Sequence, residues 1–315
     1  MSTGYYAFHQ HFGHDTGEDH PEHASRILAL EQILHKTGLW DQLIIHEGRS
    51  AHLPDILRAH NKAYVNELHL IQPEQGHIMI DEDTLMSSGS LEAALYSVGT
   101  TTQALDDVIK NVHRNAFAAI RPPGHHAERG KSMGFCFFNN TAIAALRAAD
   151  VHHLQRIAIL DFDAHQGNGT IDILQNDQRF LLLSSFQHPF YPYTHYEQNK
   201  YTNLINVHLA QGATGTDFRQ GVEEHWAPAL KRFAPELILV SAGFDAHKDD
   251  PMAELNFEEQ DYAWISQWIC NQCQSRNIPW LAILEGGYDL NALARSATLF
   301  IAAMLEKPAS NQPPA

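Results

Sequence analysis

The segment Ile157-Ala-Ile-Leu-Asp-Phe-Asp-Ala-His-Gln-Gly-Asn-Gly-Thr170 predicts both the fold and the place of a functional site. It opens with the apolar run 157–160, which is typical of a strand covered on both faces of a parallel sheet. The run leads into Asp161, Asp163 and His165, and the glycines that follow allow a tight exit from the strand. Ligands bind beyond the carboxyl ends of strands in open α/β sheets. A site is therefore expected at this strand end.

The rest of the chain repeats this alternation of strands and helices. Five further apolar runs predict strands, at residues 116–120, 180–183, 204–207, 237–240 and 281–284. Helical patterns occupy residues 24–36, 90–112, 139–149, 256–273 and 289–305. In the fourth of these, Asn256 is expected to cap the helix, with Glu259 at the capping-box position. The alternation predicts an α/β fold with an open sheet.

Composition indicates an ordinary globular protein. The 315 residues are 44% hydrophobic and 18% charged, which is enough apolar material for a large core. No internal repeat and no Gly- or Pro-rich linker divides the chain. One domain is therefore expected over residues 1–306, followed by a disordered tail at 307–315.

Charge and cysteine content exclude several functional classes. The 21 Lys and Arg residues against 37 Asp and Glu residues give a net charge of −16, which disfavours nucleic-acid binding. Three cysteines suit a reducing compartment rather than a disulfide framework. The first fifteen residues lack a signal-peptide pattern, and no apolar stretch could cross a bilayer. A cytoplasmic protein with neither membrane nor nucleic-acid partners is expected, and its oligomeric state stays open.

Three other predicted strands also end in glycine-flanked ionisable residues. Arg-Pro-Pro-Gly-His125-His126 follows residue 120, Ser-Ala-Gly-Phe-Asp245 follows residue 240, and Glu-Gly-Gly-Tyr288 follows residue 284. Together with the opening segment, four strands bring such residues to one sheet edge. This convergence is the strongest sign of a single site.

The residue types in this set suit metal-assisted hydrolysis. Asp163 and His165 lie on one face of an extended chain, and Asp245 can add a third ligand. Two carboxylates and an imidazole suit catalytic Zn²⁺, although Fe²⁺ or Co²⁺ could take the same ligands. A neutral imidazole of the 125–126 pair could then accept a proton from water, and Tyr288 could stabilise an oxyanion. The plainer alternatives are a polar strand end, solvated histidines in a turn, and a core tyrosine.

Together these motifs resemble the zinc-dependent histone deacetylase family. The resemblance rests on Arg121–His126, Gly134–Asn140, Asp161–Thr170, Ser241–His247 and Glu285–Tyr288, in the order of that family. His20-Pro-Glu, Arg26 and Asn168 are similar to its class II and bacterial branch. The resemblance covers residues 20–305. It implies the three-layer arginase/deacetylase-like fold, with a mostly parallel eight-stranded sheet, and hydrolysis of N-acyl amines.

The resemblance also implies a role for each matching residue. Asp163, His165 and Asp245 match zinc ligands, and His126 matches the general base and acid. His125, Asp161, Asn168 and Tyr288 match, in turn, an orienting histidine, its carboxylate partner, the partner of His126 and the catalytic tyrosine. Gly134, Phe135, Tyr191 and Met252 match the walls and rim of an acyl-lysine tunnel. Asp161 and Ser184 match positions at a structural K⁺ site.

The chain departs from the family pattern at several positions. Gln166 stands where many relatives have histidine, and His195 and Asp249 replace common glycines in loops expected at the pocket mouth. Met252 occupies a rim position that can be acidic in relatives specialised for acetylpolyamines, with Glu254 two residues later. This favours acyl-lysine substrates in proteins or peptides over small N-acyl amines. Asp81 and Asp83 are weaker candidates for contacting a substrate backbone.

Two further alternatives stay open at this stage. One is a non-catalytic module that binds acyl-lysine, although binding alone needs no general base. The other is an arginase-like ureohydrolase, which needs a two-metal cluster richer in carboxylates. The pair Cys270 and Cys273 lies in a predicted helix and is expected to pack rather than bind metal, and Cys136 is expected in the core.

Overall fold

The computed structural model describes residues 2–193, 202–274 and 276–306. Its centre is an eight-stranded sheet in the order β2-β1-β5-β10-β9-β6-β7-β8. All of its strand pairs are parallel, which confirms the predicted α/β class. The strands are β1 (Thr3–Ala7), β2 (Ile44–Glu47), β5 (Asn115–Ala118), β6 (Ile157–Asp161), β7 (Phe180–Gln187), β8 (Leu204–Leu209), β9 (Leu237–Ala242) and β10 (Trp280–Leu284). An antiparallel pair, β3 (His77–Met79) and β4 (Leu85–Ser87), stands apart from it.

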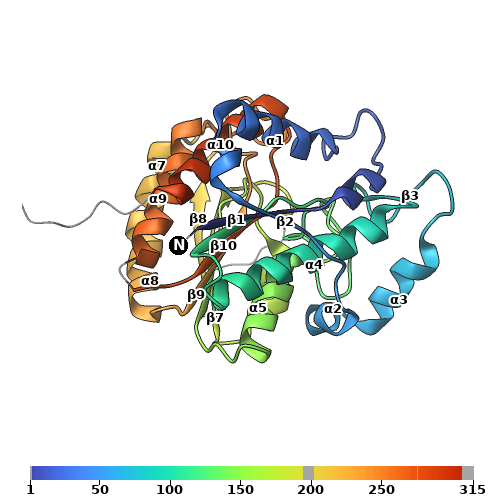
Figure 1. Ribbon diagram of the computed structural model, residues 1–315, viewed down its shortest axis with the longest axis horizontal. Coiled ribbons are helices and arrows are strands. Elements are labelled where there is room, and N and C mark those ends of the chain that lie inside the picture. The colour runs from blue at the N-terminus through green and yellow to red at the C-terminus, as the bar shows by residue number, and fades with distance from the viewer. Residues whose placement is uncertain (1, 194–201, 275, 307–315) are drawn as a thin grey trace, which may run out of the picture.

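Helices cover both faces of the sheet (Figure 1). Buried side chains on these faces form two hydrophobic cores. One core contains residues of α1 (Ser25–Thr37), α7 (Gly215–Gly221), α8 (Ala227–Phe233), α9 (Glu259–Gln274) and α10 (Leu290–Leu305). The other contains residues of α2 (Leu53–Ala59), α3 (Lys62–Ile71), α4 (Ser90–Ile109), α5 (Asn140–Asp150) and α6 (Asn168–Leu174). Short turns of 3₁₀ helix lie at His9–Gly13 and Trp40–Gln42, and a π turn lies at Val222–Trp226. The result is a three-layer structure.

The predicted strands are confirmed, and one helix start is wrong. Helix α9 begins at Glu259 instead of following a cap at Asn256. Asn256 pairs with Thr214 in an isolated parallel bridge, and its side-chain amide donates to the carbonyl of Gly212 instead of capping a helix. The carboxylate of Asp261 accepts the backbone N–H of Glu258 at 2.8 Å. The expected tail at 307–315 lies outside the described residues.

The sheet order explains why the site residues converge. Strands β5, β10, β9 and β6 are consecutive neighbours at the centre of the sheet. These are the four strands whose carboxyl ends lead into the ionisable motifs. Because parallel strands end at one edge, residues far apart in sequence meet there.

Candidate active site

Asp163, His165 and Asp245 form a buried cluster beyond β6 and β9. Nδ1 of His165 lies 3.1 Å from Oδ1 of Asp163 and 2.9 Å from Oδ2 of Asp245. One ligand atom from each residue lies within 4.8 Å of the others. All three side chains are at least nine-tenths buried. The three residues predicted as metal ligands are therefore brought together.

The surrounding backbone orients this cluster. The outer carboxylate oxygens accept backbone N–H groups, Asp163 from Gly286 and Asp245 from Ala164, each at 2.9 Å. Nε2 of His165 lies 3.1 Å from the carbonyl oxygen of Met252, an atom that can only accept a hydrogen bond. Nε2 therefore carries the hydrogen, and Nδ1 is left to face the two carboxylates. This arrangement is typical of a histidine that binds a metal through one ring nitrogen while the other is held by a backbone carbonyl.

The charges in the cluster suit a cation. Burial, together with the neighbouring Asp163 carboxylate, raises the pKa of Asp245 to about 7. Burial alone would lower the pKa of His165, but the two carboxylates outweigh it and raise that pKa well above its usual value. Two buried carboxylates so close together need compensating positive charge. A donor set of two carboxylates and one imidazole nitrogen fits a divalent metal ion.

His126 is held as a neutral imidazole. Its Nδ1 lies 2.7 Å from Oδ1 of Asn168, whose own amide nitrogen donates to the Glu128 carboxylate at 2.8 Å. Burial lowers the pKa of His126 well below its usual value, and positive charge on His125 and His165 lowers it further. Nδ1–H therefore donates to Asn168, and Nε2 is left with a free lone pair.

His125 has the opposite character. Its Nδ1 lies 3.1 Å from Oδ2 of Asp161, and its Nε2 lies 3.8 Å from Oδ1 of Asp163. Burial opposes protonation, but the charges of Asp163 and Asp161 outweigh it and raise the pKa of His125 to about 10. Two adjacent histidines thus have their pKa values pushed apart, as is common where acid and base roles are separated.

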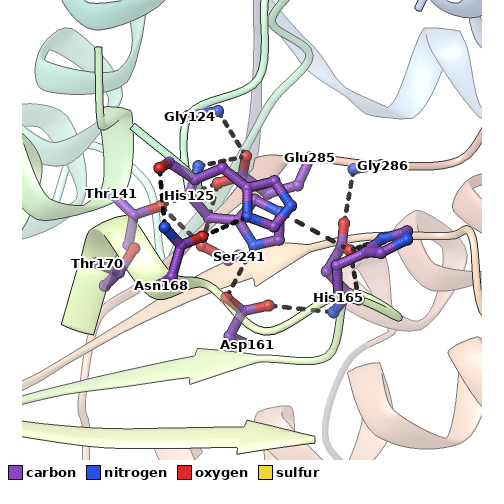
Figure 2. A network of polar contacts seen from close by, with 12 residues as sticks. Gly124, His125, Thr141, Asp161, His165, Asn168, Thr170, Ser241, Glu285 and Gly286 are labelled. Atoms are coloured by element: carbon purple, nitrogen blue, oxygen red, sulfur yellow. Dashed lines mark hydrogen bonds and ion pairs between the residues drawn. The ribbon is translucent and has the colours of Figure 1, made fainter. Parts of the chain in front are cut away.

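Glu285 joins the segment that carries the two histidines to the segment that carries Tyr288. Its carboxylate accepts the backbone N–H of Gly124 at 2.7 Å and that of His125 at 3.1 Å (Figure 2). The hydroxyls of Thr141 and Ser241 also donate to it. Burial raises its pKa to about 7. Sequence reasoning missed this role, although the Glu-Gly-Gly-Tyr motif contained the residue.

The segment that carries Tyr288 is anchored along its length. The guanidinium of Arg26 donates to the carbonyl oxygen of Gly287 at 2.6 Å and to that of Glu285 at 2.5 Å. The same guanidinium lies over the Tyr288 ring, 5.0 Å from its centroid. Asp250 accepts the backbone N–H of Tyr288 at 2.6 Å. The phenol is therefore presented by a rigid backbone.

A cavity of about 610 Å³, including space open to solvent, leads to His126 and His165. Gly134, Phe135, Tyr191 and Met252, which were expected at the tunnel walls and rim, all line this cavity, together with Asp83, Phe190 and Tyr288. Several of its aromatic rings pack edge to face. Phe135 lies 5.8 Å from Tyr288 and Tyr191 lies 5.3 Å from His126, between ring centroids. The cavity is a mainly aromatic slot that ends at the candidate metal cluster.

Gln166 and Asp249, which depart from the family pattern, both lie within the described residues. Gln166 is buried, and Asp249 forms an ion pair with Arg295 at 3.4 Å. Glu254 is exposed and accepts from the side chain of Gln187 at 2.9 Å. His195 lies outside the described residues. All three cysteines are buried, as expected for packing residues.

Comparison with known proteins identifies the family. The model of the histone deacetylase domain matches residues 20–304. The chain belongs to the histone deacetylase family. Membership in this family makes it a hydrolytic deacetylase, and the predicted recognition and enzyme class are confirmed.

Similar proteins come from archaea and plants. A probable deacetylase of Archaeoglobus fulgidus is 34% identical over 96% of this chain and 86% of that protein. A chloroplastic protein named histone deacetylase 10 from Oryza sativa is 34% identical over 94% of this chain and 72% of that protein. The solved HDA15 HD domain superposes with a TM-score of 0.90 at 28% identity, covering 96% of this chain and 89% of that one. This likeness confirms the deacetylase fold.

Within the described residues, no helix is both long and apolar enough to cross a membrane. Two plant relatives are named as chloroplastic, so the cytoplasmic location stays a prediction.

Proposed function

We propose that this deacetylase is a zinc-dependent enzyme that removes acetyl or other short acyl groups from lysine side chains of proteins or peptides. The observation that carries the proposal is the meeting of a three-ligand cluster, a neutral histidine and a tyrosine at the base of one aromatic slot. Residues 1–306 form the proposed catalytic domain, which includes the matched residues 20–304.

Asp163, His165 and Asp245 would hold the metal, with His165 binding through Nδ1. A Zn²⁺ ion at this position supplies the Lewis acidity that polarises an amide carbonyl and activates water at neutral pH. Among the described residues, the cluster offers three protein ligands, as in catalytic rather than structural zinc sites. The cluster contains too few carboxylates for the two-metal centre of a ureohydrolase, which disfavours that alternative.

His126 acts as the base and then as the acid of the proposed reaction. Its free Nε2 accepts a proton from the attacking water and later returns it to the leaving amine. Asn168 keeps the hydrogen on Nδ1 throughout. His125, paired with Asp161, keeps a positive charge beside this centre and orients the neighbouring ring. Tyr288 donates a hydrogen bond to the oxygen that becomes negative as the acyl carbon turns tetrahedral.

The slot explains the choice of an acyl-lysine. Aromatic walls at Phe135 and Tyr191 suit an aliphatic stem, whose methylenes each gain roughly 0.8 kcal/mol on full burial. Met252 lines the cavity where a carboxylate would favour polyamines, and Glu254 is paired with Gln187 instead of lining it. The general base His126, which Asn168 holds in place, also distinguishes this site from a module that only binds acyl-lysine.

A structural K⁺ is proposed near Asp161 and Ser184. These residues are register partners on β6 and β7. Among the described residues, the buried Oγ of Ser184 has no hydrogen-bond partner. Such an orphaned oxygen beside a buried carboxylate suits a monovalent cation.

An acyl-substrate panel tests the proposed function. Purified enzyme loaded with Zn²⁺ should release amine from an acetyl-lysine peptide with a higher kcat/KM than from acetylputrescine. A preference for acetylputrescine would make small N-acyl amines the substrate. Tight peptide binding without any product, under every metal tried, would mean that the site only binds acyl-lysine.

A further inference from the structure

The tunnel wall at Gly134 and Phe135 has an unusual backbone. Both residues have positive φ, +57° and +65°. The left-handed region is easy for glycine but uncommon for a residue with a bulky side chain. Phe135 nevertheless adopts it, and its ring lines the slot. Contacts from outside the turn are therefore needed to stabilise this conformation.

Two side chains from a distant loop hold the turn. Asp83 and Thr84 lie between β3 and β4, about fifty positions earlier in the chain. Oδ1 of Asp83 accepts the backbone N–H of Gly134 at 2.9 Å, and Oγ1 of Thr84 accepts that of Phe135 at 3.2 Å. The Thr84 hydroxyl donates in turn to Oδ1 of Asp83 at 3.0 Å. Thr84 is fully buried, so no solvent competes for its hydroxyl.

The turn that they hold also contacts the catalytic centre. A Cβ added to Gly134 would lie 2.3 Å from the His126 ring, so the backbone is pressed against that histidine. Asp83 itself lines the cavity, as does Tyr191 on another part of the wall. Burial and the negative charge of Asp83 raise the pKa of Tyr191. The loop therefore links two parts of the slot.

We infer that Asp83 and Thr84 are positioning residues that fix the Phe135 wall and thereby set which acyl-amine stems the slot accepts. This inference rests on the proposed function. Asp83 acts here as a hydrogen-bond acceptor for a backbone amide, so its charge is dispensable. Loss of either acceptor allows the Gly134–Phe135 turn to leave its left-handed conformation. The slot then becomes wider, so it admits bulky acyl groups and makes weaker contacts with a narrow aliphatic stem.

Matched pairs of variants test the inference. Asp83→Ala and Thr84→Val remove the acceptors, whereas Asp83→Asn and Thr84→Ser retain them. Glu82→Ala removes an exposed charge from the same loop as a control. For an acetyl-lysine peptide, the first pair should raise KM at least fivefold with kcat changed less than threefold. The same pair should reduce the preference for acetyl over a branched or aromatic acyl group at least fivefold.

The conservative pair and Glu82→Ala should stay within threefold of the parent enzyme. If Asp83→Asn raised KM as much as Asp83→Ala, charge rather than positioning would explain the residue, and the inference would be overturned. Unchanged selectivity in Thr84→Val would overturn it as well.

Hydrogen exchange separates this inference from the proposed function. In metal-free protein, the amides of a peptide spanning residues 133–136 should exchange at least tenfold faster in Asp83→Ala and Thr84→Val than in the conservative variants. If the parent enzyme hydrolysed no acyl-lysine, the proposed function would fail while this readout still tested the positioning role. Equal exchange in all variants would refute that role.

Discussion

Nδ1 of His126 lies 2.7 Å from Oδ1 of Asn168. An amide oxygen can only accept a hydrogen bond, so it fixes the hydrogen on Nδ1 and leaves Nε2 able to accept a proton. The adjacent His125 faces the carboxylate of Asp161 instead. One amide and one carboxylate thus give neighbouring imidazoles opposite protonation states, which supports the roles proposed for them.

Asn168→Asp should move the pH profile. A carboxylate in place of the amide would stabilise the protonated ring and raise the pKa of His126, which burial now holds low. Because the base must be neutral, the acidic limb of kcat/KM should shift to higher pH by at least about 1 unit. The measurement is kcat/KM on an acetyl-lysine peptide from pH 5 to 9. An unshifted limb would rule out His126 as the group that titrates.

Tyr288→Phe should reduce kcat by about 10²–10³-fold, the usual effect of losing one oxyanion donor. The ring and its contact with Arg26 remain, so the free energy of unfolding should change little. Tyr262→Phe is the matched control, because its buried hydroxyl donates to the Phe244 carbonyl outside the slot. That control should lose about 1 kcal/mol of stability and keep its kcat. A large loss of kcat in Tyr262→Phe, with kcat unchanged in Tyr288→Phe, would contradict the role given to Tyr288.

Asp245→Asn should abolish the thermal response to zinc. A ligand present at a thousand times its Kd stabilises a folded protein by about 4 kcal/mol. Differential scanning calorimetry of metal-stripped protein, with and without Zn²⁺, should show the corresponding rise in Tm for the parent chain and not for Asp245→Asn. Asp249→Asn, a change at an exposed carboxylate in the adjacent loop, should keep it. A parental rise in Tm in Asp245→Asn would place the metal elsewhere.

His60 should contribute to acid sensitivity. Burial lowers its pKa to about 4, so it stays neutral in the folded protein, where Nε2 accepts the backbone N–H of Asn139. Unfolding restores a pKa near 6.5, so unfolded chains bind the extra proton between pH 6.5 and 4. The stabilising effect is complete above pH 6.5 and is lost as pH falls through this window. Through this group, the free energy of unfolding falls by about 2 kcal/mol between pH 7 and pH 5.

Urea unfolding of metal-free protein at pH 7 and pH 5 checks this prediction. His60→Gln, which does not titrate, should lose about 2 kcal/mol less than the parent over that interval. An equal loss in both proteins would show that His60 has no such role.

Much of the fold was predictable because buried parallel strands have a clear sequence pattern. The central strands β5, β6, β9 and β10 are continuous apolar runs, and each leads into a motif of the site. The outer pair β1 and β2 was missed. Strand β1 (Thr-Gly-Tyr-Tyr-Ala) contains a threonine and a glycine, and edge strand β2 mixes exposed apolar and polar residues. Neither has the continuous apolar pattern that identifies a buried strand.

The residues of the candidate site could be predicted from the sequence, but the contacts that hold them in place were harder to predict. Asp163, His165 and Asp245 follow recognisable strand ends, and the structure brings them together as expected. The contacts of Arg26 with the Tyr288 segment and of Glu285 with the His125 segment depend on tertiary packing across more than a hundred residues. The left-handed conformation of Phe135 likewise has no local signal, because it is held from the β3–β4 loop. The wrong cap at Asn256 shows the same override of local pattern.

The central claim is that one divalent ion, held by two aspartates and a histidine at the base of the slot, is needed for amide hydrolysis. The most direct test is to titrate metal-stripped enzyme with Zn²⁺ while following amine release from an acetyl-lysine peptide. We expect no turnover without metal and a linear rise that levels off at one Zn²⁺ per chain. Full activity in the stripped enzyme would contradict the claim.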